Sequence, residues 1–172
     1  MSQVRIKFKG ISIGKYNYQF NLNDYFFTKF EESEIKKADI IADIEMIVSK
    51  DLLTFNFNIK GIVGVQCDRC LEYFNKDISH EATLYVEFGS NNSDISDADN
   101  KIVLSHSENE IVLEKHLYDY IHLSLPYQRV HPDKDNGENG CNNEIIEKLN
   151  QLNSEEKKET DPRWDKLKEL YN

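Results

Sequence analysis

The 172-residue sequence predicts an α+β protein, a curved antiparallel sheet or partly open barrel covered by a few helices. Three observations predict this class. Apolar and polar residues alternate over long stretches of residues 40–88, which is the period of a half-buried strand. An apolar residue recurs every fourth position over residues 113–125, which indicates a helix. The chain is also long enough to bury a core without a disulfide or a metal.

The N-terminal segment predicts a strand and a short hairpin. Apolar residues Val4, Ile6 and Phe8 alternate with basic residues, and residues 16–20 (YNYQF) could form the second strand. Residues 23–38 are rich in Glu and Lys, and they fit a loop or a short helix.

The middle of the chain predicts a three-stranded antiparallel meander. Residues 40–48, 52–65 and 82–88 have strand patterns, and Ser49-Lys50-Asp51 supplies the first turn. Gly61 and Gly64 in the second strand indicate a bulge or a bend.

Short elements are predicted after the meander. Residues 101–104 read as a strand, and the helix over 113–125 ends at Pro126. Asn142 can cap a further helix whose buried face would be Ile145, Ile146, Leu149 and Leu152. We therefore expect a sheet-plus-helix core domain at residues 1–130, with a C-terminal loop and helical appendage, residues 131–172, that packs on it.

A last short helix is predicted to begin at Asp161 and Pro162. Trp164, Leu167 and Leu170 share one face of it, so this helix is predicted to dock on the protein's own surface or on a second copy in a homodimer. These three residues are also candidate contacts for another partner, with Trp164 as the anchor.

The net charge of −10 disfavours unaided binding to a phosphate backbone. Residues 1–20 carry four basic residues and no acid, which is either a local nucleic-acid patch or the solvent face of a strand. No apolar run typical of a signal peptide or a membrane span is present, so we expect a cytoplasmic protein whose cysteines are reduced thiols or metal ligands.

The most informative motif is VQCDRCLEYF at residues 65–74, where Cys67 and Cys70 have the spacing of a zinc knuckle. His131 and Cys141 could complete a closed Cys3His zinc site. Metal-free thiols in a turn are the alternative, and redox chemistry is disfavoured because the pair is flanked by strands. Arg69 lies in the same turn and is a candidate contact residue, although a solvated turn is the simpler explanation.

These motifs occur in a distinctive order: the VQCDRCLEYF knuckle, an acidic loop, a helix running into LSLPYQRVH, a further Cys and a closing DPRWDKLKEL. Over roughly residues 35–172 the chain resembles the YceD family. The resemblance implies a role in the accumulation of large-subunit ribosomal RNA. It matches the knuckle at Cys67, Arg69, Cys70 and Leu71, the helix exit at Leu125 and Pro126, the polar or metal-like positions at His131 and Cys141, and the tail at Asp161, Pro162, Arg163, Leu167 and Leu170.

The resulting hypothesis is a non-enzymatic factor for large-subunit rRNA accumulation or ribosome assembly. Its partner would be a ribosomal protein or a pre-ribosomal particle, and RNA contact would be indirect, because the acidic surface repels phosphate. The competing hypotheses are a thiol- or zinc-dependent enzyme and a zinc-stabilised structural module. No Walker loop, GxGxxG, HExxH or triad spacing supports an enzyme.

Overall fold

The computed structural model describes residues 4–89, 100–133 and 140–155. The chain divides into two compact units. The sheet unit comprises residues up to Gln66 and Tyr73–Arg129, and the knuckle unit comprises Cys67–Glu72 and the residues from Val130. The prediction that residues 131–172 pack on a core formed by residues 1–130 stays a prediction.

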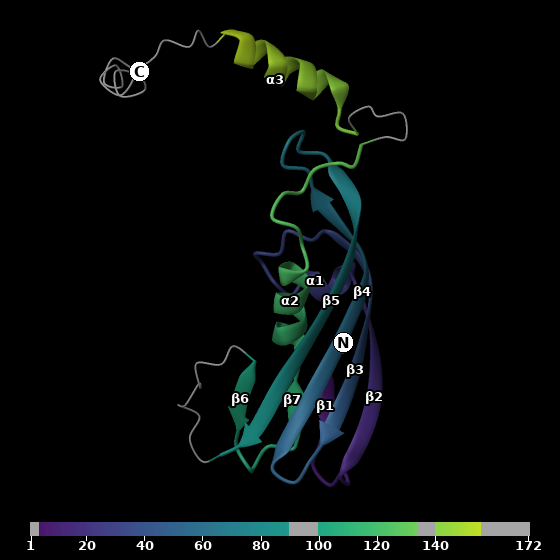
Figure 1. The fold of residues 1–172 in the computed structure, drawn as a ribbon, viewed down its shortest axis with the longest axis vertical. Coiled ribbons are helices and arrows are strands. Elements are labelled where there is room, and N and C mark those ends of the chain that lie inside the picture. The colour runs from purple at the N-terminus through teal and green to yellow at the C-terminus, as the bar shows by residue number, and fades with distance from the viewer. Residues whose placement is uncertain (1–3, 90–99, 134–139, 156–172) are drawn as a thin grey trace, which may run out of the picture. The chain divides into compact units, whose positions relative to one another are not determined.

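The sheet unit is built around a five-stranded sheet with the order β2-β3-β4-β5-β6 (Figure 1). The strands are β2 (Gly14–Asn23), β3 (Lys37–Val48), β4 (Leu52–Gln66), β5 (Tyr73–Phe88) and β6 (Lys101–Leu104). Strands β3, β4 and β5 form the predicted antiparallel meander, and β2 extends it by pairing antiparallel with β3. The α+β class is confirmed.

The edge strand β6 corrects the prediction of a purely antiparallel sheet. It pairs parallel with β5, so that Tyr85 lies opposite Lys101, and the sheet is mixed and open rather than a closed barrel. Periodicity within a short segment reports which side chains are buried, but not the direction of the neighbouring strand.

The predicted N-terminal hairpin is wrong. Strand β1 (Arg5–Lys7) pairs antiparallel with β7 (Glu110–Val112), a strand that we did not predict. The backbone N–H of Leu113 extends this pairing by donating to the carbonyl of Val4 at 2.9 Å. These partners lie more than 100 residues apart in sequence, and no local turn signal can indicate such a pairing.

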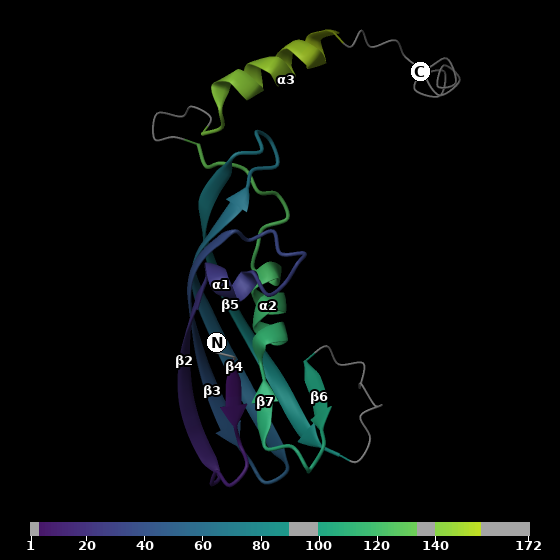
Figure 2. The same ribbon diagram turned by 180° about the vertical axis from the view of Figure 1, so that it is seen from behind.

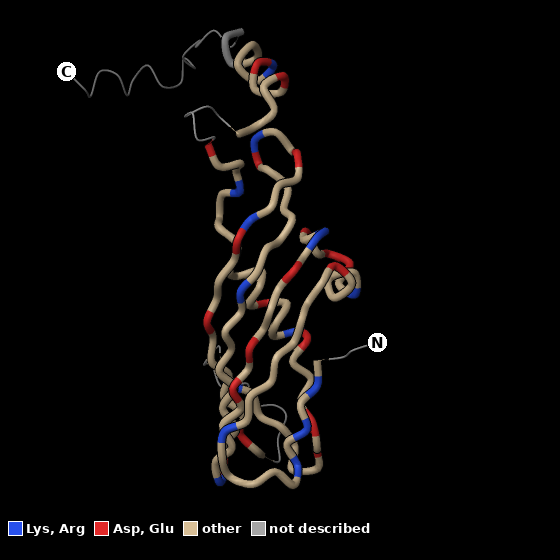
Figure 3. The backbone as a smooth tube through the Cα atoms, turned by 90° about the vertical axis from the view of Figure 1, so that its right-hand side faces the viewer, with Lys and Arg blue, Asp and Glu red and all other residues tan. Residues whose placement is uncertain are grey.

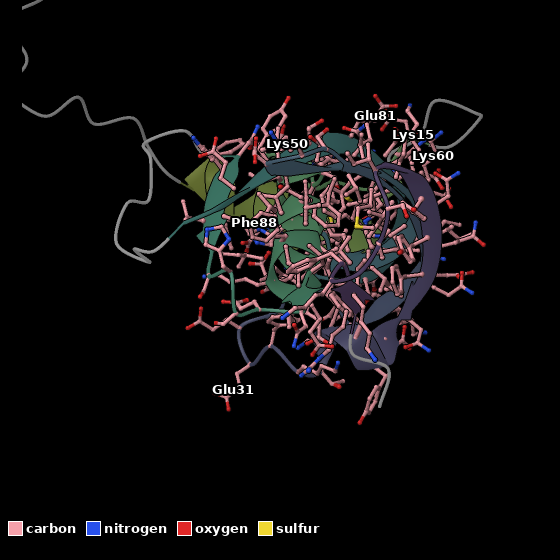
Figure 4. The ribbon with its side chains drawn as sticks, turned by 90° about the horizontal axis from the view of Figure 1, so that it is seen from below. Lys15, Glu31, Lys50, Lys60, Glu81 and Phe88 are labelled. Atoms are coloured by element: carbon pink, nitrogen blue, oxygen red, sulfur yellow. The ribbon has the colours of Figure 1, made fainter. Side chains whose placement is uncertain are left out.

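Two helices and the β1–β7 pair cover one face of the five-stranded sheet (Figure 2). The helices are α1 (Asp24–Phe27) and α2 (Glu114–Leu123), and an end-on view shows the sheet bending around α2 (Figure 4). The predicted stripe of α2 is correct: Leu113, Leu117 and Ile121 are fully buried, and Leu125 is partly buried against the same core. The sheet supplies the other half of this core, including Ile40, Ile44, Met46, Phe55, Ile59, Val63, Leu84 and Val86.

Gly61 allows a close approach of two strands, and of the predicted bulge or bend the bulge is absent. The register between β4 and both neighbours is uninterrupted through Gly61 and Gly64. A Cβ at position 61 would lie 2.2 Å from the carbonyl oxygen of Asp39. Only a residue without a side chain fits against β3 at this point.

The knuckle unit contains α3 (Asn143–Glu155). Asn142 caps it as predicted, because its Oδ1 accepts a hydrogen bond from the N–H of Glu144 at 3.0 Å. The predicted buried face is only partly correct, since Ile145 and Ile146 are half-buried but Leu149 and Leu152 are exposed. The predicted helical segment at 161–171, with Trp164, lies outside the described residues.

Within the part of the chain that the structure describes, no helix combines the length and apolar character that a membrane span requires.

Candidate metal centre

The Cys67–Glu72 turn holds two cysteines in place between β4 and β5. The N–H of Cys67 donates to the carbonyl of Glu72 at 2.9 Å, and the N–H of Leu71 donates to the carbonyl of Cys67 at 2.9 Å. Leu71 has a φ of 61°, a left-handed conformation that is unfavourable for a residue with a side chain. The turn buries the side chains of Cys67 and Cys70 almost completely.

A second segment supplies His131 and Cys141. Gly140 permits the close approach of the chain beside them, because a Cβ there would lie 2.1 Å from the carbonyl oxygen of Pro132. Cys141 is buried and His131 is half-buried. Asn142 connects this segment to the turn, since its Nδ2 donates to Oε1 of Glu72 at 2.7 Å.

The four predicted ligand residues converge. Their ligand atoms all lie within 4.8 Å of one another, and we call them the Cys3His cluster (Cys67, Cys70, His131 and Cys141). The Sγ atoms of Cys67 and Cys141 are 3.8 Å apart, and Sγ of Cys70 is 3.4 Å from Nδ1 of His131. The sequence prediction that these residues meet is therefore confirmed.

These distances fit a tetrahedral zinc ion. Sulfur ligands about 2.3 Å from a tetrahedral centre are about 3.8 Å apart, and a sulfur–nitrogen pair is about 3.6 Å apart. The Cys67–Cys141 and Cys70–His131 pairs are already close to these separations. The cluster could therefore bind a metal with only small shifts of its side chains.

The protonation of the thiols also suits a metal ligand set. Burial raises the pKa of the Cys67 thiol, but the backbone N–H groups of Cys70, Arg69 and His131, with the His131 ring, outweigh it and lower the pKa to about 6. Burial and the neighbouring cysteine sulfurs raise the pKa of Cys141 to about 11. One sulfur is thus ready as a thiolate, and a cation would favour ionisation of the others.

The donor set favours zinc over harder ions. Thiolate and imidazole ligands suit zinc, whereas calcium and magnesium require oxygen ligands. Four protein ligands fill a tetrahedral shell, so that such a site keeps no position for a substrate. The cysteines are also too buried to act readily as exposed redox thiols.

Of the remaining predicted site residues, the structure describes only Arg69. Arg69 lies exposed in the turn, and its backbone N–H contributes to the low pKa of Cys67. Trp164, Leu167 and Leu170 lie outside the described residues. Sequence reasoning missed the supporting roles of Glu72 and Gly140, although the Gly beside a candidate ligand was a usable signal of close approach.

Fold and site together define an α+β protein with a buried Cys3His cluster beside a knuckle turn. A family model described as "Large ribosomal RNA subunit accumulation protein YceD" matches residues 55–171, which is more than half of the chain and includes all four residues of the cluster. The chain belongs to the YceD family. Comparison with curated proteins finds no match, and comparison with solved structures finds none either.

Proposed function

We propose that this protein is a non-enzymatic factor that supports large-subunit rRNA accumulation or ribosome assembly, mainly through protein contacts. We also propose that the Cys3His cluster binds a structural zinc ion. The observation that carries the proposal is the family match, whose description names large ribosomal RNA subunit accumulation. The match extends over the cluster, and it therefore connects that process to the part of the chain with the most distinctive chemistry.

The geometry of the cluster supports a structural role for the metal. The four ligands converge on one point, and among the described residues of the knuckle unit the only buried side chains are the three cysteines. The described residues of this unit form no apolar core, and a metal would take the place of one, as in small zinc-stabilised modules. A filled tetrahedral shell offers no position for substrate activation.

Charge supports protein rather than RNA as the direct partner. The net charge of −10 repels phosphate, while it attracts the basic segments of proteins that bind rRNA. Arg69, Trp164, Leu167 and Leu170 are the proposed contact residues. Their contribution is tested by comparing partner capture by the wild type with capture by Arg69→Gln and Trp164→Ala.

Metal analysis tests the zinc site. Protein purified without chelators should contain about one zinc per chain, and Cys141→Ser should contain much less. His106→Gln is the matched control, because His106 is an exposed histidine of the sheet unit. A wild type that neither contains zinc nor takes it up would support metal-free thiols instead.

Depletion of the protein in its host tests the process. The ratio of large- to small-subunit rRNA should fall and should be restored by the wild-type chain. Cys141→His separates structural from catalytic roles, because imidazole can replace a structural zinc ligand but cannot replace a catalytic thiolate. A zinc-loaded Cys141→His protein that fails to restore the ratio would favour an enzyme, and an unchanged ratio after depletion would contradict the proposed function.

A capture experiment tests the partner class. Tagged protein should retain ribosomal proteins after ribonuclease treatment, with capture weakening as salt rises. Loss of every partner on ribonuclease treatment would show that RNA is the direct contact.

A further inference from the structure

The uncovered face of the five-stranded sheet carries two rows of polar side chains across four strands. The first row is Asn17, Glu45, Asn56 and Thr83, which lie opposite one another in register. The second row, two residues further along each strand, is Gln19, Asp43, Asn58 and Glu81. Polar residues are expected on the solvent face of such a sheet, but four of these eight are Asn or Asp, which are disfavoured in strands.

These two rows line a groove of about 870 Å³. Among its described lining residues are three carboxylates, Asp43, Glu45 and Glu81, and no Lys or Arg. Figure 4 shows Glu81 on the side of the sheet away from α2. Figure 3 shows acidic and basic positions interspersed along the strands.

The carboxylate of the first row already has partners. The ammonium of Lys15 lies 3.0 Å from Oε1 of Glu45, and Nδ2 of Asn56 donates to Oε2 of the same carboxylate at 3.1 Å. The hydroxyl of Thr83 donates to Oδ1 of Asn56 at 3.1 Å. The hydrogen bond from Lys15 keeps the pKa of Glu45 below its usual value, so this carboxylate stays ionised at neutral pH.

The second row keeps acceptors that no described residue satisfies. Gln19 donates to one oxygen of Asp43 at 2.8 Å, but neither Asp43 nor Glu81 forms an ion pair with a described residue. Between them, Oδ1 of Asn58 is almost completely buried and accepts no hydrogen bond from the described residues. An unsatisfied buried acceptor is costly, and Asn58 is among the residues that line the groove.

We infer that this groove binds an extended protein segment rich in arginine and lysine. The second row presents two carboxylates that form no ion pair with a described residue. Carboxylates are acceptors only, and guanidinium and ammonium groups are donors only. The same charges repel the phosphates of RNA. The inference rests on the proposed function in taking the partner to be a protein, and it adds the binding site and the chemistry of the bound segment.

The dimensions of the groove limit the length of the segment. Four adjacent strands span three spacings of about 4.8 Å, or about 14 Å, and an extended chain advances about 3.3 Å per residue. Four or five residues therefore cross the two rows. Successive side chains of an extended segment point to opposite sides, so two or three basic side chains face the carboxylates.

The test uses the full-length protein and a fluorescein-labelled peptide, Arg-Gly-Arg-Gly-Arg-Gly-Arg. A labelled peptide with Glu in place of each Arg is the negative control. Anisotropy should show binding of the Arg peptide only. Asp43→Asn with Glu81→Gln should weaken it at least about tenfold, because each change removes a charge-assisted hydrogen bond. Asp39→Asn with Asp77→Asn is the matched control, since it removes one charge each from β3 and β5 outside the groove.

A second measurement locates the peptide directly. The side-chain amide signal of Asn58 in a proton–nitrogen correlation spectrum should shift on addition of the Arg peptide. The inference is overturned by absence of binding, by equal losses in the two double variants, by an unshifted Asn58 signal, or by stronger binding of an RNA oligonucleotide to the same groove.

The two proposals fail separately. If the peptide does not bind but depletion still lowers large-subunit rRNA, the groove inference is wrong and the proposed function stands. If the peptide binds as described but depletion leaves rRNA unchanged, the groove binds basic segments in another process.

Discussion

Replacing Cys141 by serine should release zinc from the knuckle unit and unfold that unit alone. Among its described residues only Cys67, Cys70 and Cys141 are buried, so a zinc ion bound by the cluster would hold the unit together. Structural zinc contributes about 10–16 kcal/mol of apparent binding free energy. Loss of one ligand in four removes roughly a quarter of this, or about 3 kcal/mol, which weakens zinc binding about a hundredfold.

Two assays measure the effect. Competition with a chromogenic chelator gives the zinc affinity of each variant, and hydrogen exchange gives the local stability. In Cys141→Ser the amides of α3 should exchange faster, because a helix of 13 residues is only marginally stable on its own. Exchange in β3 and β4 should be unchanged, since the core of the sheet unit contains no residue of the cluster.

The control is Cys141→His, which offers nitrogen in place of sulfur and should keep most of the affinity. The reasoning is refuted if Cys141→Ser binds zinc as tightly as the wild type. It is equally refuted if chelation leaves the exchange of α3 unchanged, because the unit would then be stable without a metal.

Three further predictions concern the sheet unit. Leu117→Ala should lower the free energy of unfolding by about 2–5 kcal/mol in urea titrations, whereas Leu123→Ala on the same helix, 71% exposed, should change it little; similar losses would contradict the assigned core. Gly61→Ala should cost about 1–3 kcal/mol, because the added Cβ would overlap the carbonyl of Asp39, and an unchanged urea midpoint would refute the close approach. Burial lowers the pKa of His116, so the unfolded state binds this proton more readily and stability should fall as pH drops below about 6.5. His116→Gln should reduce that fall, and an identical pH dependence would contradict it.

The strands of the meander and the helix α2 were predictable because each has its own periodicity. Residues 52–65 alternate over most of β4, and the four-residue repeat ending at Leu125 could only bury one face of a helix. Asn142 was likewise recognisable as a helix cap from its position before α3. In each case, the decisive interactions lie within a few residues of one another.

The partners of the short strands were not predictable. Strand β1 has three residues, and its sequence fits a hairpin with residues 16–20 as well as it fits β7. The parallel pairing of β6 likewise depends on how the chain returns to β5. We predicted that Leu149 and Leu152 are buried, but both are exposed. An apolar stripe indicates a helix face that can be buried, without indicating what covers it.

By itself, the sequence determined the α+β class, the meander and the identity of the four cluster residues, because cysteine and histidine are few and their chemistry is specific. Only the tertiary structure decided that Cys141 reaches Cys67 across 74 positions, and that Asp43, Asn58 and Glu81 from three strands share one row. The physical reason is the same in both cases. Side-chain chemistry is a local property, whereas distance between remote residues depends on the register and the path of the whole chain.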